Sequence, residues 1–222
     1  MTRIYLVRHC EAMGNVKRLF QGTSDFDISE TGAKQLEFLT ERFKDVRLDK
    51  IYTSPLIRTV KTAKAIAGKR EIPVIKFDGL IEINGGILES RPFSESFVEY
   101  PDLADKWVNA PHKFAPENGE PMWEAYERIW NTVKTLAEEN KGKTIAAATH
   151  GGVTRCLLCR LIKGDIEKLK DMGWTENTAV TLIEVDDDAN VRLVYHNDHS
   201  HLPEEFLPKR NSISSYTGSV KE

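Results

Sequence analysis

The sequence predicts an α/β fold, a three-layer doubly wound arrangement with helices on both faces of a mainly parallel sheet. Two observations predict it. Short apolar runs alternate with longer segments whose apolar residues recur at helical spacing, a pattern typical of βαβ units. The last two apolar runs are instead joined by a short acidic turn, which predicts an antiparallel pair at the sheet edge near the C-terminus.

Six strands are expected in chain order. They are the apolar runs at 4–7, 50–53, 72–77, 144–148, 179–185 and 191–195. Each is short and bounded by polar or charged residues, as buried strands usually are. The turn between the last two runs contains Asp186, Asp187 and Asp188.

The first two helices can be placed by their ends. Apolar residues at helical spacing predict a helix over 33–43, with Ser29 or Thr31 as its N-cap. The second helix is expected to contain Pro55 in its first turn, where proline is favoured. Gly68 follows the last apolar residue of that helix and suits a C-terminal stop.

The third helix, over 122–140, has the clearest pattern. We expect one face of it to pack on the core and to contain Trp123, Tyr126, Trp130, Val133 and Leu136. A fourth helix is expected after His150-Gly151-Gly152 and should run to Lys163.

Residues 1–222 are expected to form a single domain, interrupted by an irregular insertion at about 84–121. The insertion contains five of the nine prolines, so one or two short helices are the most regular structure expected there. The polar, glycine-containing segment at 8–29 is interpreted as loop. The last dozen residues, rich in serine, are expected to be loosely ordered.

Charge and hydropathy exclude several classes of protein. The chain has 31 Lys plus Arg and 34 Asp plus Glu, a formal net charge of −3. Such a balance argues against a nucleic-acid partner or a polybasic membrane surface. No apolar run approaches the length of a membrane span, and the first apolar stretch is too short for a signal peptide. The cytoplasm is therefore the expected location, and no metal or other cofactor is expected.

The three cysteines, Cys10, Cys156 and Cys159, do not resemble a disulfide framework. Cys156 and Cys159 lie in an apolar helical segment, so two reduced core thiols are the favoured interpretation over a redox or zinc pair.

Chemically complementary side chains follow four of the predicted strands. Because ligands bind at the carboxyl ends of strands in open α/β sheets, we expect these residues to converge. They are Arg8, His9, Ser54, Arg58, Glu82 and His150. Two guanidiniums can bind a phosphate bidentately, a histidine can act as nucleophile, and a carboxylate can transfer protons.

These residues lie in motifs that resemble the histidine phosphatase superfamily, which includes the cofactor-dependent phosphoglycerate mutases. The opening motif is Leu6-Val7-Arg8-His9-Cys10-Glu11-Ala12 with Asn15 after it. The further matches, in the family's order, are Gln21-Gly22, residues 29–35, residues 51–59, residues 80–83, Asn118-Gly119-Glu120 and residues 149–153. Together these blocks cover about residues 4–160.

The resemblance implies a two-step transfer in which His9 takes the phosphoryl group. Glu82 would protonate the leaving oxygen and then activate water against the phosphohistidine. Neutral His9 is favoured by the cations flanking it, and protonated Glu82 by a dianionic substrate. Activity with a bell-shaped pH dependence is therefore expected.

The other matched positions are implied to hold the substrate. Those expected to contact the phosphoryl oxygens are Arg8, Asn15, Arg58, His150 and the amide of Gly151. Gln21 and Gly22 would contact phosphate or substrate near the pocket mouth.

Departures from the family pattern favour phosphatase over mutase activity. The mutases carry Glu-Arg-His-Tyr-Gly after the acid, and here Glu82 is followed by Ile83-Asn84-Gly85-Gly86. Ile87-Leu88-Glu89-Ser90 replaces a common Trp-Glu-Gly, so the substrate-facing wall should differ. The expected partner is a small phosphorylated substrate. A phosphoglycerate mutase and a non-catalytic phosphate-binding or partner-binding module remain alternatives, whereas a metal-dependent phosphatase lacks a clustered aspartate motif.

Cys10 stands where the family has glycine and Ala12 where it has threonine. Either the position of Cys10 does not need glycine or the loop holding His9 is altered. A reactive Cys10 thiol, favoured by nearby arginines, is an alternative.

Three other features are left open. Arg91 and His112 in the insertion are either substrate contacts or, more simply, solvated surface. The tail cluster of His196, Asp198, His199 and His201 has spacing compatible with metal ligands, but a structural role is favoured. A homodimer is the default expectation for oligomeric state.

Overall fold

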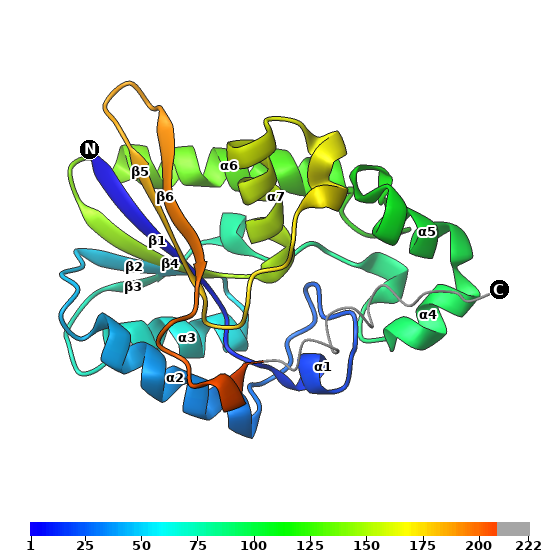
Figure 1. Ribbon diagram of the computed structural model, residues 1–222, viewed down its shortest axis with the longest axis horizontal. Helices are drawn as coiled ribbons and strands as arrows, with labels where there is room; N and C mark the ends of the chain where they lie inside the picture. Colours follow the sequence, from blue (N-terminus) through cyan, green and yellow to red (C-terminus); the bar gives the residue numbers. More distant parts are fainter. Residues whose placement is uncertain (208–222) are drawn as a thin grey trace.

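The structure is a computed structural model that describes residues 1–207. Its sheet has the strand order β3-β2-β4-β1-β5-β6 (Figure 1). The strands are β1 Thr2–Arg8, β2 Lys50–Thr53, β3 Val74–Lys76, β4 Thr144–Thr149, β5 Val180–Val185 and β6 Val191–Asp198. β3, β2, β4 and β1 are parallel, while β5 runs antiparallel to both β1 and β6. The predicted fold class is confirmed.

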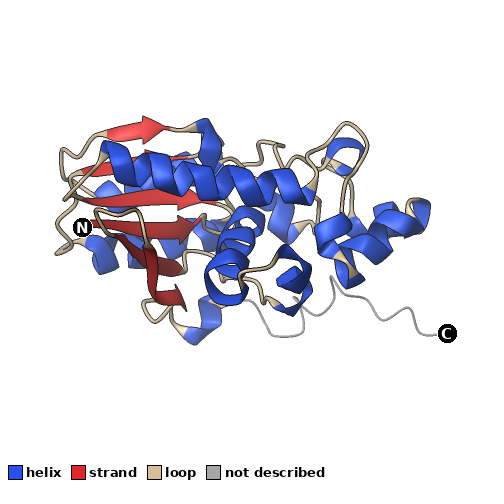
Figure 2. Ribbon diagram, turned by 90° about the horizontal axis from the view of Figure 1, so that it is seen from above, coloured by secondary structure: helices blue, strands red, loops and turns tan. Residues whose placement is uncertain are grey.

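Helices cover both faces of the sheet, which makes three layers (Figures 1 and 2). α2 Glu30–Phe43 and α3 Ile57–Ala67 cover one face, and α6 Met122–Glu139 and α7 Gly151–Lys163 cover the other. Successive side chains along a strand point to opposite faces of the sheet, so each strand contributes to the cores on both faces. Ile4 and Leu6 of β1 pack in the core with α6 and α7, whereas Val7 packs in a second core with α2 and α3.

Two of the three predictions for the helix ends are confirmed. Ser29 caps α2, because its Oγ accepts a hydrogen bond from the Gly32 amide at 2.9 Å. Gly68 ends α3 with φ of 60°, a conformation that favours glycine. The prediction for Pro55 was wrong, since α3 begins at Ile57 and extended Leu56 separates the two residues.

Two further predictions need correction. The strand expected at 72–77 is limited to Val74–Lys76, because it is an exposed edge strand paired only with β2. Trp123 does not lie on the core face of α6 and is 57% exposed. The buried face of α6 contains Met122, so Trp123 is rotated by about 100° from it.

The insertion contains α4 Phe93–Glu99 and α5 Pro101–Asn109, together with the single turns η2 Gly86–Leu88 and η3 Pro111–Lys113. Two short helices were therefore correctly expected. They lie beyond the carboxyl ends of the parallel strands (Figure 2). The segment interpreted as loop at 8–29 contains one short helix, α1 Met13–Val16.

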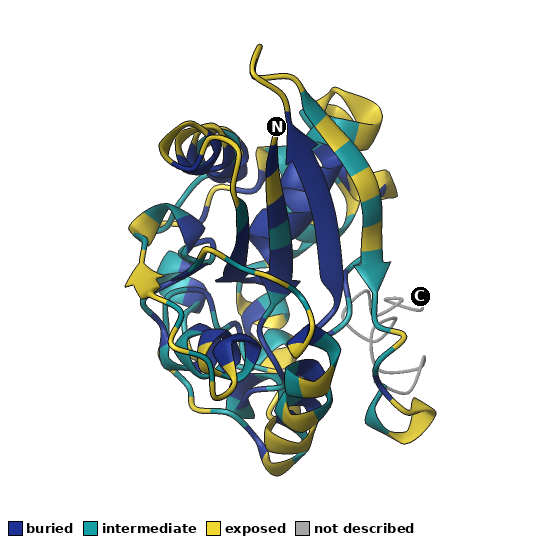
Figure 3. Cartoon of the chain, turned by 90° about the vertical axis from the view of Figure 1, so that its left-hand side faces the viewer, coloured by how far each residue is buried: buried dark blue, intermediate teal, exposed yellow. Residues whose placement is uncertain are grey.

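Three 3-10 segments complete the described chain: the single turns η1 Asp78–Leu80 and η5 Glu204–Phe206, and the longer η4 Ile166–Asp171. In Figure 3 most residues of the central strands are buried, whereas the outer strand β6 alternates between partly buried and exposed residues. Within residues 1–207, no helix is long and apolar enough to cross a membrane. The expectation of a loosely ordered last dozen residues falls outside the described residues, and the single-domain assignment stays a prediction.

Candidate active site

An open cavity lies at the carboxyl ends of β1 and β4, and its empty space, adjoining solvent included, is about 800 Å³. It is bounded on the far side by residues of α4 and α5. Eight of the nine residues that the family resemblance assigns to the site line it: Arg8, His9, Asn15, Gln21, Gly22, Arg58, Glu82 and Gly151. The ninth, His150, is fully buried behind the ring of His9.

His9 has a fixed ring and a neutral side chain. Its Nδ1 lies 2.6 Å from the carbonyl oxygen of Cys10, so Nδ1 carries the proton and donates it. Nε2 is then the nitrogen with a free lone pair. Burial lowers the pKa of His9 well below its ordinary value, and the charges of Arg58 and Arg8 lower it further. A deprotonated imidazole nitrogen between two guanidiniums is suited to attack a bound dianion.

The backbone of His9 is also held from the loop before β5. The side-chain amide of Asn177 donates to the His9 carbonyl at 2.9 Å. The amide of Thr178 donates to the Arg8 carbonyl at 3.1 Å, and Thr178 has φ of 57°. Positive φ is an outlier for a β-branched residue, so the surrounding contacts must enforce this turn.

Arg58 is fully buried, and two backbone carbonyls orient its guanidinium. Nη2 donates to the carbonyl of Gly22 and Nη1 to that of Ser24, each at 2.7 Å. Burial lowers the pKa of Arg58, but an arginine remains charged. Arg8 is oriented in the same way, because it donates to the carbonyl of Thr175. Carbonyl anchors thus aim both cations at one end of the cavity.

Glu89 organises the loop that anchors Arg58. Its Oε1 accepts hydrogen bonds from the amides of Thr23 and Gly85 at 2.9 and 2.7 Å, and its Oε2 accepts from the amide of Ser24 at 3.0 Å. Gly22 has φ of +30°, and a Cβ there would lie 1.8 Å from Glu89 Oε1, so a side chain is excluded. In the sequence, Glu89 stands out only as part of a departure from the family motif, which gives no sign of this role.

Asn15 and Gln21 also line the cavity. Asn15 is on α1, and its Oδ1 accepts a hydrogen bond from the Ala12 amide at 2.9 Å. That bond leaves the amide nitrogen of Asn15 available for an anion. The Oε1 of Gln21 is buried and has no hydrogen-bond partner among the described residues.

His150 sits one layer deeper. Its ring centroid is 5.2 Å from that of His9, and its Nε2 lies 2.8 Å from Ser54 Oγ. The other ring nitrogen is buried and has no partner among residues 1–207. Burial lowers the pKa of His150 well below its ordinary value, and the charge of Arg58 lowers it further. A neutral His150 can donate one hydrogen bond toward a ligand next to His9.

Glu82 lies at the N-terminus of α7, where backbone amides favour an anion. Its Oε2 accepts from the amide of Gly152 at 2.9 Å, and its Oε1 accepts from Val153 at 3.1 Å and Ile83 at 3.0 Å. A Cβ on Gly152 would lie 2.6 Å from Glu82 Oε1, so glycine is needed for this approach.

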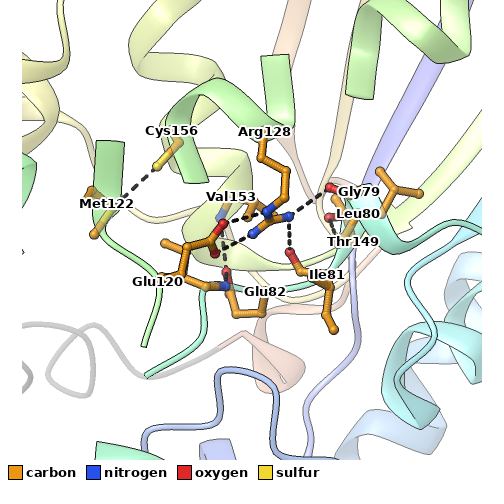
Figure 4. A network of polar contacts seen from close by, with 11 residues as sticks. Gly79, Leu80, Ile81, Glu82, Glu120, Met122, Arg128, Thr149, Val153 and Cys156 are labelled. Atoms are coloured by element: carbon orange, nitrogen blue, oxygen red, sulfur yellow. Dashed lines mark hydrogen bonds and ion pairs between the residues drawn. The ribbon is translucent and has the colours of Figure 1, made fainter. Parts of the chain in front are cut away.

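The segment that carries Glu82 is tied to α6 by Arg128 (Figure 4). Nη1 of Arg128 donates to the carbonyls of Gly79 and Ile81 at 2.9 and 2.8 Å. Glu120 pairs with the same guanidinium through two hydrogen bonds of 2.7 Å. Arg128 was missed in the sequence because it occupies an ordinary helical position.

Comparison with known proteins agrees with this geometry. Residues 4–199 match the family model of the histidine phosphatase superfamily, branch 1. The chain belongs to the histidine phosphatase superfamily. A phosphoserine phosphatase 1 of Hydrogenobacter thermophilus is 32% identical over 213 residues, which are 96% of this chain and 100% of that protein. A probable phosphoglycerate mutase of Yersinia pestis is also 32% identical, over 73% of this chain and 75% of its own.

Two solved structures of similar fold cover most of this chain. The YhfR protein of Bacillus stearothermophilus is 32% identical, with a TM-score of 0.86 over 90% of this chain and 99% of its own. The alpha-ribazole phosphatase of Shigella flexneri is 26% identical, with a TM-score of 0.79 over 88% and 96%.

Cys10 in this histidine phosphatase is not a reactive thiol. The side chain is fully buried, and burial raises its pKa to about 12 despite a hydrogen bond from Thr62 that lowers it. The alternative that nearby arginines favour a thiolate is therefore wrong. Cys10 does not have positive φ, so this position does not require the glycine usual in the family.

Cys156 and Cys159 are free, buried core thiols, as favoured from the sequence. Burial raises the pKa of both, so neither favours a thiolate. Within residues 1–207, no group of three or more candidate ligands is placed to hold a metal ion.

The tail cluster makes contacts within the protein. Asp198 pairs with Arg42 at 2.5 Å, and hydrogen bonds from Ser200 and Arg42 outweigh burial to lower its pKa to about 2. Nε2 of His201 lies 3.1 Å from Thr178 Oγ1, and burial lowers the pKa of His201 to about 4. His199 Nδ1 lies 2.9 Å from the carbonyl of Asn197.

Arg91 and His112 do not line the cavity. Arg91 pairs with Glu99 and bonds to Tyr100 within the insertion. The insertion does contribute cavity residues, but they are aromatic: Phe93 and Trp107. Trp174, before β5, joins them. None of the three was predicted to line the site, since an aromatic residue in an irregular segment has no periodic pattern.

Proposed function

We propose that this histidine phosphatase hydrolyses phosphomonoesters of small metabolites through a phosphohistidine at His9. The observation that carries the proposal is the surrounding of His9. A neutral Nε2 faces a cavity that also contains the guanidiniums of Arg8 and Arg58 and the carboxyl group of Glu82. Phosphoryl transfer needs mainly positioned charge, and this set supplies it.

In the first step, Nε2 of His9 forms a bond to phosphorus while the bond from phosphorus to the ester oxygen breaks. Arg8, Arg58, Asn15, His150 and the amide of Gly151 hold the three non-bridging oxygens. The proton stays on Nδ1 and is donated in a hydrogen bond to the carbonyl oxygen of Cys10, which stabilises the positive charge that develops on the ring.

Glu82 acts as general acid in the first step and as general base in the second. It gives a proton to the departing ester oxygen, and its carboxylate then removes one from the attacking water. Water forms the new bond to phosphorus, the nitrogen–phosphorus bond breaks, and neutral His9 returns. Gln21 and Gly22 contact the substrate at the cavity mouth. The bell-shaped pH dependence expected from this exchange stays a prediction.

The test is phosphate release from a panel of phosphomonoesters in excess chelator. Wild type should be active, His9→Ala inactive, and His196→Ala, which removes an exposed histidine, unchanged. Alkaline quenching during turnover should trap phosphate on the peptide containing His9 in wild type. Absence of the phosphopeptide in an active enzyme would overturn the mechanism.

The same tubes should include 3-phosphoglycerate, with formation of 2-phosphoglycerate followed. Isomerisation without phosphate release would instead assign a mutase, the activity named for the Yersinia relative. Silence on every ester would favour a phosphate-binding or partner-binding module, or a larger substrate outside the panel.

Location and assembly are further parts of this proposal. Three free cysteines in the described chain suit a reducing compartment, so we infer the cytoplasm. A homodimer remains the expected assembly, and size-exclusion chromatography with light scattering would test it.

A further inference from the structure

The cavity lining has two chemically different parts. The polar part contains His9, the two guanidiniums and Glu82, as described above. The other part is an apolar wall formed by Leu19, Phe20, Phe93, Trp107 and Trp174, and Trp174 lies next to Gly151 and Arg8, where the two parts meet. The wall residues come from the segment after α1, from α4, from α5 and from the loop before β5, so tertiary structure alone brings them together.

Trp107 is the centre of this wall. Its ring centroid lies 5.2 Å from Phe20, 6.2 Å from Phe93, 4.8 Å from Phe114 and 5.9 Å from Trp174. Both tryptophans are only half-buried, so they still present ring surface at the cavity. An aromatic ligand group would add one more ring to an existing cluster.

Trp174 is held in place from behind. The Arg155 guanidinium carbon lies 5.0 Å from the Trp174 ring centroid. Arg155 itself donates to the carbonyls of Met172 and Leu169 at 2.9 and 2.8 Å. The indole is therefore positioned before a ligand arrives, which reduces the entropy lost on binding.

The charged residues of the cavity indicate which charge a leaving group can carry. Its cationic lining residues are Arg8 and Arg58, and both flank His9, where the phosphoryl group is expected. Within residues 1–207, no lysine and no third arginine lines the cavity. With Arg8 and Arg58 occupied by the phosphoryl group, a carboxylate on the leaving group would find no further cation among the described lining residues, and an unpaired buried charge is costly.

We infer that the preferred substrates are phosphomonoesters whose leaving group is uncharged and carries a flat aromatic ring, with Trp107 and Trp174 as specificity-determining residues. This inference rests on the proposed phosphatase function. It separates this chain's expected substrates from carboxylate-bearing esters such as phosphoserine, for which the Hydrogenobacter relative is named.

The test compares alkyl esters, so that the chemistry of the breaking bond is similar. The esters are 2-phenylethyl phosphate, glycerol 3-phosphate and 3-phosphoglycerate. Wild type should show a kcat/KM for the phenylethyl ester about tenfold above the other two. Trp107→Leu and Trp174→Leu should each lower that ratio by about fivefold. Trp123→Leu, which removes an exposed tryptophan outside the cavity, is the matched control and should leave the ratio unchanged.

A binding measurement separates failure of this inference from failure of the proposed function. Calorimetry with His9→Ala should show tighter binding of 2-phenylethylphosphonate than of 3-phosphonopropionate, whether or not any ester is hydrolysed. Equal or reversed affinities would overturn the inference, as would an active wild type that prefers 3-phosphoglycerate. A ratio unchanged in both cavity tryptophan variants would also overturn it.

Discussion

Side chains outside the cavity do much to aim the residues inside it. Arg58 is oriented by the carbonyls of Gly22 and Ser24, and Glu89 binds the amides of the same loop. His9 is oriented by the Cys10 carbonyl on its ring and by Asn177 on its backbone. A hydrogen bond to a charged group contributes about 1.5–3 kcal/mol, so such supports can affect catalysis measurably.

Glu89→Gln should weaken catalysis without contacting substrate. The amide nitrogen of glutamine would face a backbone donor, either at Ser24 or at Thr23 and Gly85. With the loop loosened, Arg58 loses its fixed direction, and we expect kcat/KM to fall by about tenfold. Steady-state kinetics would measure this. Glu95→Gln, an exposed change on α4, is the control, and equal kinetics for both variants would refute the role of Glu89.

Cys10 should resist alkylation in the folded protein. Because burial raises its pKa to about 12, almost no thiolate is present at pH 8, and the side chain is inaccessible. Intact-mass measurement after iodoacetamide treatment should show no modification at Cys10, whereas the protein in denaturant should be modified at all three cysteines. Rapid labelling of native Cys10 would contradict its burial.

At the scale of elements, α7 and α6 cooperate to place Glu82. The N-terminus of α7 supplies amides to the carboxyl group, and Arg128 on α6 anchors the preceding segment through two carbonyls. Glu82 itself follows the three-residue turn η1, so it does not lie in a helix or strand that would hold it in place. Packing of α6 on this segment therefore substitutes for regular secondary structure.

Arg128→Met should affect both stability and catalysis. It removes the bonds to Gly79 and Ile81 and leaves the mostly buried Glu120 without its partner. We expect the free energy of unfolding to fall by about 3 kcal/mol and kcat by about tenfold. Urea unfolding and kinetics would measure the two effects.

Arg160→Met is a suitable control for that experiment. Arg160 on α7 is about as exposed as Arg128, pairs with Glu127 and packs over Tyr126 and Trp130. It should cost about 1 kcal/mol of stability and leave kcat unchanged. An equal loss of kcat in both variants would show that the Arg128 effect is not specific to Glu82.

For the whole molecule, two buried neutral histidines make stability depend on pH. The pKa of His9 and that of His150 lie well below 6.5 in the folded protein, chiefly through burial. Below about pH 6.5 the unfolded chain binds protons that the folded chain does not, so acidification favours unfolding. Stability is therefore full above that pH and is lost as the pH falls.

The expected loss is about 1 kcal/mol per pH unit for each histidine below pH 6. Urea unfolding of wild type at pH 7, 6 and 5 should show it. His150→Asn should reduce the slope, while His196→Asn, at an exposed position, should keep it. A wild-type stability that does not change between pH 7 and 5 would contradict the burial of these charges.

The sequence by itself determined the fold class and most of the residues at the strand ends. Parallel strands place their carboxyl ends along one edge, so Arg8, His9 and His150 had to meet once the strands were recognised. Local chemistry also determined the Ser29 cap and the Gly68 stop, because these depend on a few adjacent residues.

Only the tertiary structure decided which residues support and surround that site. Arg128 reaches Ile81 across 47 positions of the chain, and Trp107 meets Trp174 from the insertion. The predicted helix start at Pro55 and the predicted core position of Trp123 were wrong by only one or two residues. Both depend on packing partners, because these decide where a helix begins and where its buried face ends. Burial likewise decided that Cys10 is inert, because desolvation acts through all surrounding atoms rather than through neighbours in sequence.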